Sequence, residues 1–228
     1  MTTTLTLPPL RLSDFKLIAF DMDSTLIDIE TVDEIADIAG CGPEVAAITE
    51  ATMRGEITDY KDSLRRRVAL LRGVPLSALQ AVYDQRLHLN PGAETLIAAC
   101  KQAGLRVVLL SGGFTFFTDR LRDRLKLDDT RSNVLEIEEG RLTGRMLPQP
   151  WGDICDGEAK KDKLLECCRA MGIPPAQAIA VGDGANDLPM MRVAGLSVAY
   201  HAKPLVREAA MLAIDEGGLD RLLGFLKP

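Results

Sequence analysis

The chain has 228 residues, 46% of them hydrophobic and 26% charged, which is enough for one large domain or for a core domain that carries a smaller inserted one. A net charge of −6 and an aromatic content of 4% argue against a nucleic-acid partner and favour a small-molecule substrate. The sequence has neither an apolar run of about 18 residues nor the basic start of a signal peptide, so we expect no membrane partner and a cytoplasmic location.

The first predicted element is a strand that ends in two carboxylates. Residues 1–13 are expected to be a loose leader, and an apolar run over residues 16–20 then leads into Asp21 and Asp23. Such a run is typical of a buried strand in a parallel sheet, where ligands bind beyond the carboxyl ends of the strands. The two carboxylates would repel each other unless a cation lies between them or one holds a proton, and either arrangement suits an enzyme. A solvated turn is the alternative for this motif taken alone.

The next segment predicts a helical lid. We expect a small helical cap over residues 29–89, inserted after the first strand, because the pattern there is helical and contains no strand-like run. One of its helices carries an apolar stripe formed by Tyr60, Leu64, Val68 and Leu71. At about 100° per residue, Arg67 points toward the covered side of this helix, whereas Arg65 and Arg66 point away. Arg67 would therefore meet an anion, although a solvated basic face is the alternative for all three arginines.

A second strand also ends in polar groups. The strand predicted over residues 106–111 ends at Ser111, and Gly112 and Gly113 follow before a helix from about residue 115 to 126. Glycine lets the backbone approach an anion closely, and a helix start adds favourable partial charge. The turn is therefore a candidate anion site, with a plain strand-to-helix turn as the alternative.

A third strand ends in acids. The strand predicted over residues 177–182 is followed by Asp183, Asn186 and Asp187. Before it, a hairpin is expected over residues 133–146 as an accessory flap, and a helix that opens near residue 158 contains Lys160. Because a lysine near a helix start opposes the helix dipole, Lys160 is either directed at a phosphate or belongs to a surface lysine cluster.

The order of these elements predicts the fold class. Strands and helices alternate from residue 92 onward, with further strands expected over residues 196–200 and 212–214 and a last helix over residues 218–226. This alternation favours an α/β fold with a doubly wound, mostly parallel sheet. The catalytic core would comprise residues 14–28 and 90–228.

The motifs in this order, FDMDSTL, SGG, a downstream lysine and GDGANDLPMM, resemble those of the haloacid dehalogenase-like phosphatases. Within that superfamily the stretches DSTL, ETVDE, MRGE and SLRRRV resemble the phosphoserine phosphatase family, and the likeness covers nearly everything from Ile18 onward. The resemblance implies Mg²⁺-dependent hydrolysis of O-phosphoserine to serine and phosphate, through an aspartyl phosphate, in serine biosynthesis.

The resemblance also implies roles for single residues. Asp21 would be the nucleophile, and Asp23 the general acid and then the base. The Mg²⁺ ligands would be the carboxylates of Asp21 and Asp183 and the backbone carbonyl of Asp23. The phosphoryl oxygens would be bound by Ser111, the Gly112 N–H, Lys160 and Asn186, with Asp187 orienting Lys160. Glu30 would pair with the ammonium of the substrate and Arg67 with its carboxylate.

Other functions compete with this interpretation. The nearest is a phosphatase or phosphotransferase of the same fold for another small phosphomonoester, which the pair Glu30 and Arg67 argues against. A dehalogenase would not need the acid Asp23. A signalling module phosphorylated on Asp21 is a more distant alternative, since such a module needs neither Asp23 nor a lid. The oligomeric state is left open.

Overall fold

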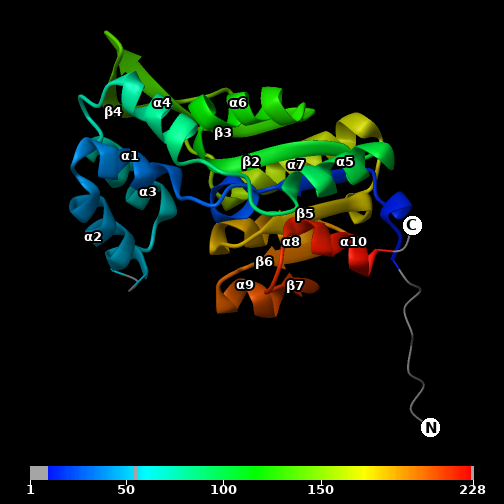
Figure 1. Ribbon diagram of the computed structural model, residues 1–228. Helices are drawn as coiled ribbons and strands as arrows, with labels where there is room; N and C mark the ends of the chain where they lie inside the picture. The colour runs from blue at the N-terminus through cyan, green and yellow to red at the C-terminus, as the bar shows by residue number, and fades with distance from the viewer. Residues whose placement is uncertain (1–9, 54–55, 227–228) are drawn as a thin grey trace.

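The computed structural model describes residues 10–53 and 56–226, and these contain one seven-stranded sheet in the order β4-β3-β2-β1-β5-β6-β7 (Figure 1). Every neighbouring pair is parallel except β3 and β4. The strands are β1 (Leu17–Phe20), β2 (Arg106–Phe114), β3 (Asp129–Glu138), β4 (Arg141–Leu147), β5 (Ala178–Gly182), β6 (Leu196–Tyr200) and β7 (Leu212–Ile214). The predicted α/β class with a mostly parallel sheet is confirmed. Of the expected leader, residues 1–9 lie outside the described part of the chain.

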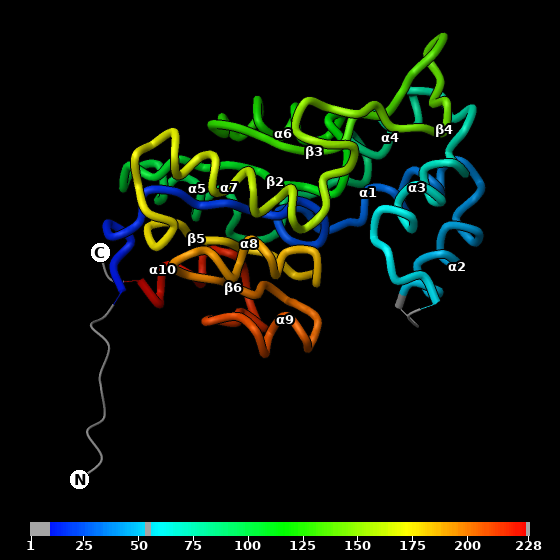
Figure 2. The backbone as a smooth tube through the Cα atoms, turned by 180° about the vertical axis from the view of Figure 1, so that it is seen from behind, coloured from blue at the N-terminus to red at the C-terminus, as the bar shows by residue number. Residues whose placement is uncertain are grey.

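Helices cover both faces of this sheet, so it is doubly wound (Figures 1 and 2). On one face, alternate strand residues such as Ile18 and Phe20 pack with α5 (Ala93–Gln102), α6 (Thr115–Leu125) and α10 (Leu222–Phe225). On the other, Leu17 and Ala19 pack with α7 (Gly157–Met171), α8 (Leu188–Val193) and α9 (Pro204–Ala209). All four residues of β1 are buried, as its unbroken apolar sequence predicts. The expected last helix is shorter than predicted, because a 3-10 turn, η5 (Leu219–Arg221), precedes α10.

Between residues 29 and 89 the described chain forms helices and no named strand. These helices are α1 (Thr31–Ala39), α2 (Gly42–Met53), α3 (Tyr60–Leu70) and α4 (Leu76–Gln85), and they lie together beyond one end of the sheet (Figure 1). The chain enters and leaves this group side by side, since Ile27 and Leu89 form a backbone bridge. The Asn90 side chain donates to the Thr25 and Ile27 carbonyls at the same place. We use the term cap for residues 29–89, a boundary that stays a proposal.

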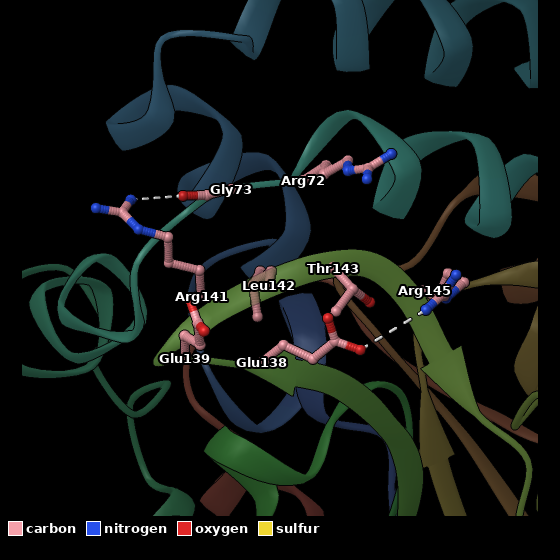
Figure 3. A pocket seen from close by; sticks show the side chains of 8 residues that line it. All are labelled: Arg72, Gly73, Glu138, Glu139, Arg141, Leu142, Thr143 and Arg145. Atoms are coloured by element: carbon pink, nitrogen blue, oxygen red, sulfur yellow. Dashed lines mark hydrogen bonds and ion pairs between the residues drawn. The ribbon is translucent and has the colours of Figure 1, made fainter.

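The hairpin around Gly140 is present, but it differs from the accessory flap that the sequence predicts. Its first strand, β3, begins at Asp129 and pairs with β2, so the hairpin extends the main sheet. It also contacts the cap, because Gly73 N donates to Leu142 O (2.7 Å) and Leu142 N donates to Val74 O (2.8 Å). An open hollow of about 650 Å³ lies at this junction, where Arg141 donates to Gly73 O (Figure 3). No helix in the described residues is long and apolar enough to cross a membrane.

Candidate active site

The carboxyl ends of β1, β2 and β5 meet at one edge of the sheet, because the three strands are adjacent, parallel and in register. A cavity of about 430 Å³ lies between this edge and helices α1 and α3 of the cap. Seven of the predicted site residues line it: Asp21, Asp23, Glu30, Arg67, Gly112, Asp183 and Asn186. The other three, Ser111, Lys160 and Asp187, are completely buried. The fold thus gathers at one place residues that are far apart in the sequence.

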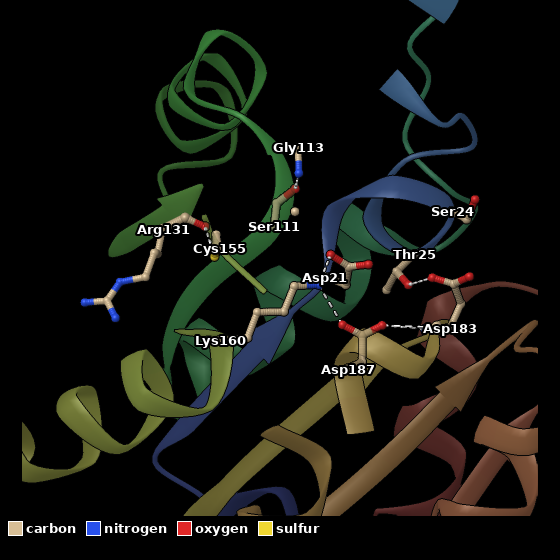
Figure 4. A network of polar contacts seen from close by, with 12 residues as sticks. Asp21, Ser24, Thr25, Ser111, Gly113, Arg131, Cys155, Lys160, Asp183 and Asp187 are labelled. Carbon is tan, nitrogen blue, oxygen red and sulfur yellow. Dashed lines mark hydrogen bonds and ion pairs between the residues drawn. The ribbon is translucent and has the colours of Figure 1, made fainter. Parts of the chain in front are cut away.

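Lys160 lies inside the protein and not in a surface cluster. It belongs to the first turns of α7, whose N-cap, Asp156, accepts a hydrogen bond from Ala159 N (2.9 Å). Its Nζ atom lies 2.6 Å from Asp21 Oδ1 and 2.7 Å from Asp187 Oδ1 (Figure 4). Burial lowers the pKa of Lys160, but the charges of Asp187 and Asp21 more than offset this effect and raise the pKa well above its usual value. Lys160 is therefore a fixed cation beside Asp21.

Asp187 holds several parts of the site together. Its Oδ1 atom accepts a hydrogen bond from Lys160 Nζ. Its Oδ2 atom accepts hydrogen bonds from the backbone N–H groups of Gly184 (3.0 Å) and Asp183 (3.2 Å). Gly182 is required beside it, because a Cβ atom there would lie 2.4 Å from the Asp187 carboxylate. Both carboxylate oxygens of Asp187 are thus engaged, which leaves them less available to a metal than those of Asp21 and Asp183.

The acids at the sheet edge are close enough to hold a cation. Oxygen atoms of Asp21, Asp183 and Asp187 lie within 4.8 Å of one another. The pKa of Asp21 is raised well above its usual value by burial and by the neighbouring carboxylates, despite Lys160. Burial and the charge of Asp187 raise the pKa of Asp183 to about 6. A divalent cation would relieve this repulsion, and oxygen donors of this kind are those that Mg²⁺ prefers.

Asp23 lies in the turn η2 (Met22–Leu26) that follows β1, and its carboxylate faces the cavity. Thr31 N donates to Asp23 Oδ1 (2.9 Å), which ties this turn to the start of α1. Burial and the charge of Glu30 raise the pKa of Asp23 to about 7, and the hydrogen bond from Thr31 opposes this change. Near neutral pH the carboxyl group can therefore give up a proton and take one back.

On the cap side, the arginines of α3 divide as their helical phase predicts. Arg67 lines the cavity, and its Nε atom is buried without a hydrogen-bond partner among the described residues. Arg65 and Arg66 are exposed and form ion pairs with Asp153 and Asp62. Glu30 is also exposed at the cavity rim, where its Oε1 atom accepts a hydrogen bond from Ser24 Oγ (2.7 Å). The cap thus presents a cationic group, with one buried donor that has no partner among the described residues, and an anionic group to the cavity.

Several residues near the site were not predicted from the sequence. Tyr60, which the sequence suggests only as a core residue, lines the cavity, and a Cβ atom at Gly112 would lie 2.0 Å from its hydroxyl oxygen. Asn133 is 1% exposed and contacts the backbone carbonyls of Gly112 and Gly113. Asparagine is disfavoured in strands. The position of Asn133 in a predicted strand was therefore the one feature of the sequence that could have indicated a special role for this residue.

Known proteins identify the family. The family model described as haloacid dehalogenase-like hydrolase matches residues 18–192. A protein of Polaromonas sp. named phosphoserine phosphatase is 72% identical over 96% of this chain and 93% of its own length. A protein of the same name from Albidiferax ferrireducens is 69% identical over 97% of this chain and 93% of its own. The chain belongs to the phosphoserine phosphatases of the haloacid dehalogenase-like hydrolase family.

Solved structures of the phosphoserine phosphatase family share the fold. One, described as a phospho-aspartyl intermediate analogue of phosphoserine phosphatase, has a TM-score of 0.85 and 38% identity over 93% of this chain and 99% of its own. Another, described as a substrate-bound phosphoserine phosphatase complex, has a TM-score of 0.85 and 37% identity over the same shares of the two chains.

Proposed function

We propose that this family member hydrolyses O-phosphoserine to serine and phosphate through a phosphoryl group carried on Asp21. The observation that carries the proposal is a single cavity with two kinds of groups at its opposite sides. The sheet edge presents Asp21 and Asp23, which suit phosphoryl transfer, and the cap presents Arg67 and Glu30, which suit a carboxylate and an ammonium group. A phosphomonoester of an amino acid complements both sides.

Asp21 and Asp23 would perform the covalent chemistry. A carboxylate oxygen of Asp21 attacks phosphorus, the Asp21 O–P bond forms, and the bond from phosphorus to the serine oxygen breaks. Asp23 donates its proton to the departing serine oxygen. It then takes a proton from the water that attacks the aspartyl phosphate, which releases phosphate and restores Asp21. The raised pKa of Asp23, about 7, supports both roles.

The surrounding groups would bind the phosphoryl oxygens. Donors from three elements are available: the Ser111 hydroxyl, the Gly112 N–H, the Lys160 ammonium and the Asn186 amide. Because Lys160 is already held between Asp21 and Asp187, little reorganisation is needed when charge develops on the phosphoryl group. Asp187 orients Lys160 and does not itself contact the substrate in this scheme.

The acidic donor set fits Mg²⁺, and we propose the carboxylates of Asp21 and Asp183 and the backbone carbonyl of Asp23 as its ligands. When bound, Mg²⁺ would neutralise charge on the phosphoryl oxygens and relieve the repulsion between carboxylates that, together with burial, raises the pKa values of Asp21 and Asp183. Thr25 Oγ1 donates to Asp183 Oδ1 (3.2 Å), which helps to orient that carboxylate.

We further propose a place for this reaction in serine biosynthesis, since free serine is the product. A cytoplasmic location follows from the substrate, because a phosphate ester with several charges does not cross a membrane readily.

The direct test is phosphate release from O-phosphoserine by the purified chain with Mg²⁺. Matched comparison substrates are O-phosphoethanolamine, which lacks the carboxylate, and 3-phosphooxypropanoate, which lacks the ammonium. A third ester, p-nitrophenyl phosphate, lacks both groups. We expect kcat/KM to be highest for O-phosphoserine, because only this ester engages Arg67 and Glu30 together. An equal or higher value for an ester that lacks one of these groups would favour another phosphomonoester as the substrate, and transfer of the phosphoryl group to added alcohols would indicate a phosphotransferase.

A further inference from the structure

β2 bulges where the predicted phosphoryl site begins. The β2 and β3 partners Leu110 and Arg131 are followed by the partners Phe114 and Asn133, so β2 advances four residues while β3 advances two. The extra residues of β2 leave the regular ladder, and Gly112 and Gly113 lie among them. A side chain at either glycine would force its neighbours to move, since a Cβ atom at Gly112 would lie 2.0 Å from the Tyr60 hydroxyl oxygen and one at Gly113 would lie 2.7 Å from Met22 Cε.

One side chain satisfies the backbone carbonyls of this bulge. Asn133 Nδ2 donates to Gly112 O (2.7 Å) and to Gly113 O (3.2 Å) from a position that is 1% exposed. The peptide that follows Gly112 is therefore fixed in direction, and Gly113 N donates to Ser111 Oγ (2.8 Å). The Ser111 oxygen already accepts this bond, so its own O–H is free to donate to a phosphoryl oxygen. In the proposed scheme the Gly112 N–H is the backbone donor to the same group.

The other end of the Asn133 carboxamide reaches the helix that carries Lys160. Asn133 Oδ1 accepts a hydrogen bond from Cys155 N (2.8 Å), directly before the N-cap Asp156 of α7. The two ends of one buried amide thus connect the β2 bulge with the start of α7. Because all three bonds are made within the protein, the amide has no remaining polar atom that needs another partner.

We propose that Asn133 is a positioning residue of the phosphoryl site. It holds the bulge and the start of α7 at a set spacing, so that the Gly112 N–H, the Ser111 hydroxyl and the Lys160 ammonium meet on one phosphoryl group. This inference rests on the proposed function to the extent that the cavity binds a phosphoryl group. Asn133 itself does not touch the substrate.

The variant that tests this proposal is Asn133→Asp. It keeps the size of the side chain and the acceptor for Cys155 N, but it replaces the donor to Gly112 O and Gly113 O by a carboxylate oxygen. Loss of one oxyanion donor typically costs a factor of about 100 to 1000, and displaced donors cost less. We therefore expect the inhibition constant of orthophosphate to rise about 10- to 100-fold, and kcat/KM for p-nitrophenyl phosphate to fall by a similar factor.

The discriminating readout is inhibition by the two products. Serine would be held by the cap, so its inhibition constant should change less than about twofold. A purely structural role would instead weaken serine and orthophosphate together. Inhibition constants do not depend on the amount of folded enzyme, so a partly unfolded preparation of Asn133→Asp or of a second variant, Asn133→Ala, still gives the answer.

Ser132→Ala is the matched control. Ser132 precedes Asn133 in β3, is 4% exposed and shares a hydrogen bond of 2.7 Å with Thr118 Oγ1, away from the bulge. It should lower the melting temperature without changing either inhibition constant. Unchanged orthophosphate inhibition in both Asn133 variants, or equal weakening of serine and orthophosphate, would overturn the proposal. Absence of serine inhibition in the unmodified enzyme would instead count against the proposed substrate, and the orthophosphate and aryl phosphate measurements would still test Asn133.

Discussion

Arg67→Ala should separate recognition of the amino-acid part of the substrate from phosphoryl chemistry. The Arg67 Nε atom is buried and unpaired among the described residues, and the side chain lines the cavity that contains Asp21. A hydrogen bond to a charged group contributes about 1.5–3 kcal/mol, which corresponds to a factor of about 10 to 150 in kcat/KM. Because the substrate would also be positioned less well, the loss in kcat/KM could reach about 1000-fold.

The assay compares kcat/KM for O-phosphoserine with that for O-phosphoethanolamine, which keeps the ester and the ammonium but lacks the carboxylate. We expect Arg67→Ala to lower the first value by about 10- to 1000-fold and to leave the second nearly unchanged. p-Nitrophenyl phosphate should behave like O-phosphoethanolamine, because Asp21 and Asp23 remain in place to act on its phosphate.

Arg66→Ala is the control for this experiment, because Arg66 pairs within its own helix with Asp62 (2.8 Å). Arg65 is a poorer control than its helical phase suggests, because it forms an ion pair with Asp153, which lies outside the cap. Equal losses on all three substrates would show that Arg67 has a general structural or phosphate-binding role. A larger effect of Arg66→Ala than of Arg67→Ala would show that the assigned helical phase is wrong.

Three further predictions concern the sheet edge. Asp21→Asn should abolish turnover but keep substrate binding, because the amide retains the shape and loses the nucleophile; a phosphorylated residue other than Asp21 in acid-quenched enzyme would contradict this. Asp23→Asn should still form phosphoenzyme from p-nitrophenyl phosphate, whose leaving group needs no acid, but this phosphoenzyme should be hydrolysed slowly. Unchanged turnover of O-phosphoserine would refute the role of Asp23 as acid and base. Chelation should remove activity and Mg²⁺ should restore it, whereas Ca²⁺ should support activity poorly. Asp183→Ala should raise the Mg²⁺ concentration that activity requires. Full activity in a chelator would exclude the metal site.

Much of the fold follows from local patterns in the sequence. The apolar run of β1 predicts a strand buried on both faces, and all of its residues are buried. Three such strands ending in polar groups indicate where the site lies, since parallel strands bring their carboxyl ends to one edge. The direction of Arg67 follows from helical periodicity, which acts within a few turns and needs no knowledge of the rest of the chain.

The tertiary structure decided what depends on contacts between distant segments. Whether Lys160 belonged to a surface cluster or faced a phosphate could not be settled locally, because its partner Asp21 is 139 positions away. The bulge of β2 and its support by Asn133 arise from pairing with β3, a neighbour that the local pattern does not identify. The raised pKa of Asp23 likewise depends on burial beneath the cap and on Glu30. Periodicity thus determined which faces are buried, whereas the packing of separate segments decided which polar groups meet there, since burial and charge depend on every element that surrounds a residue.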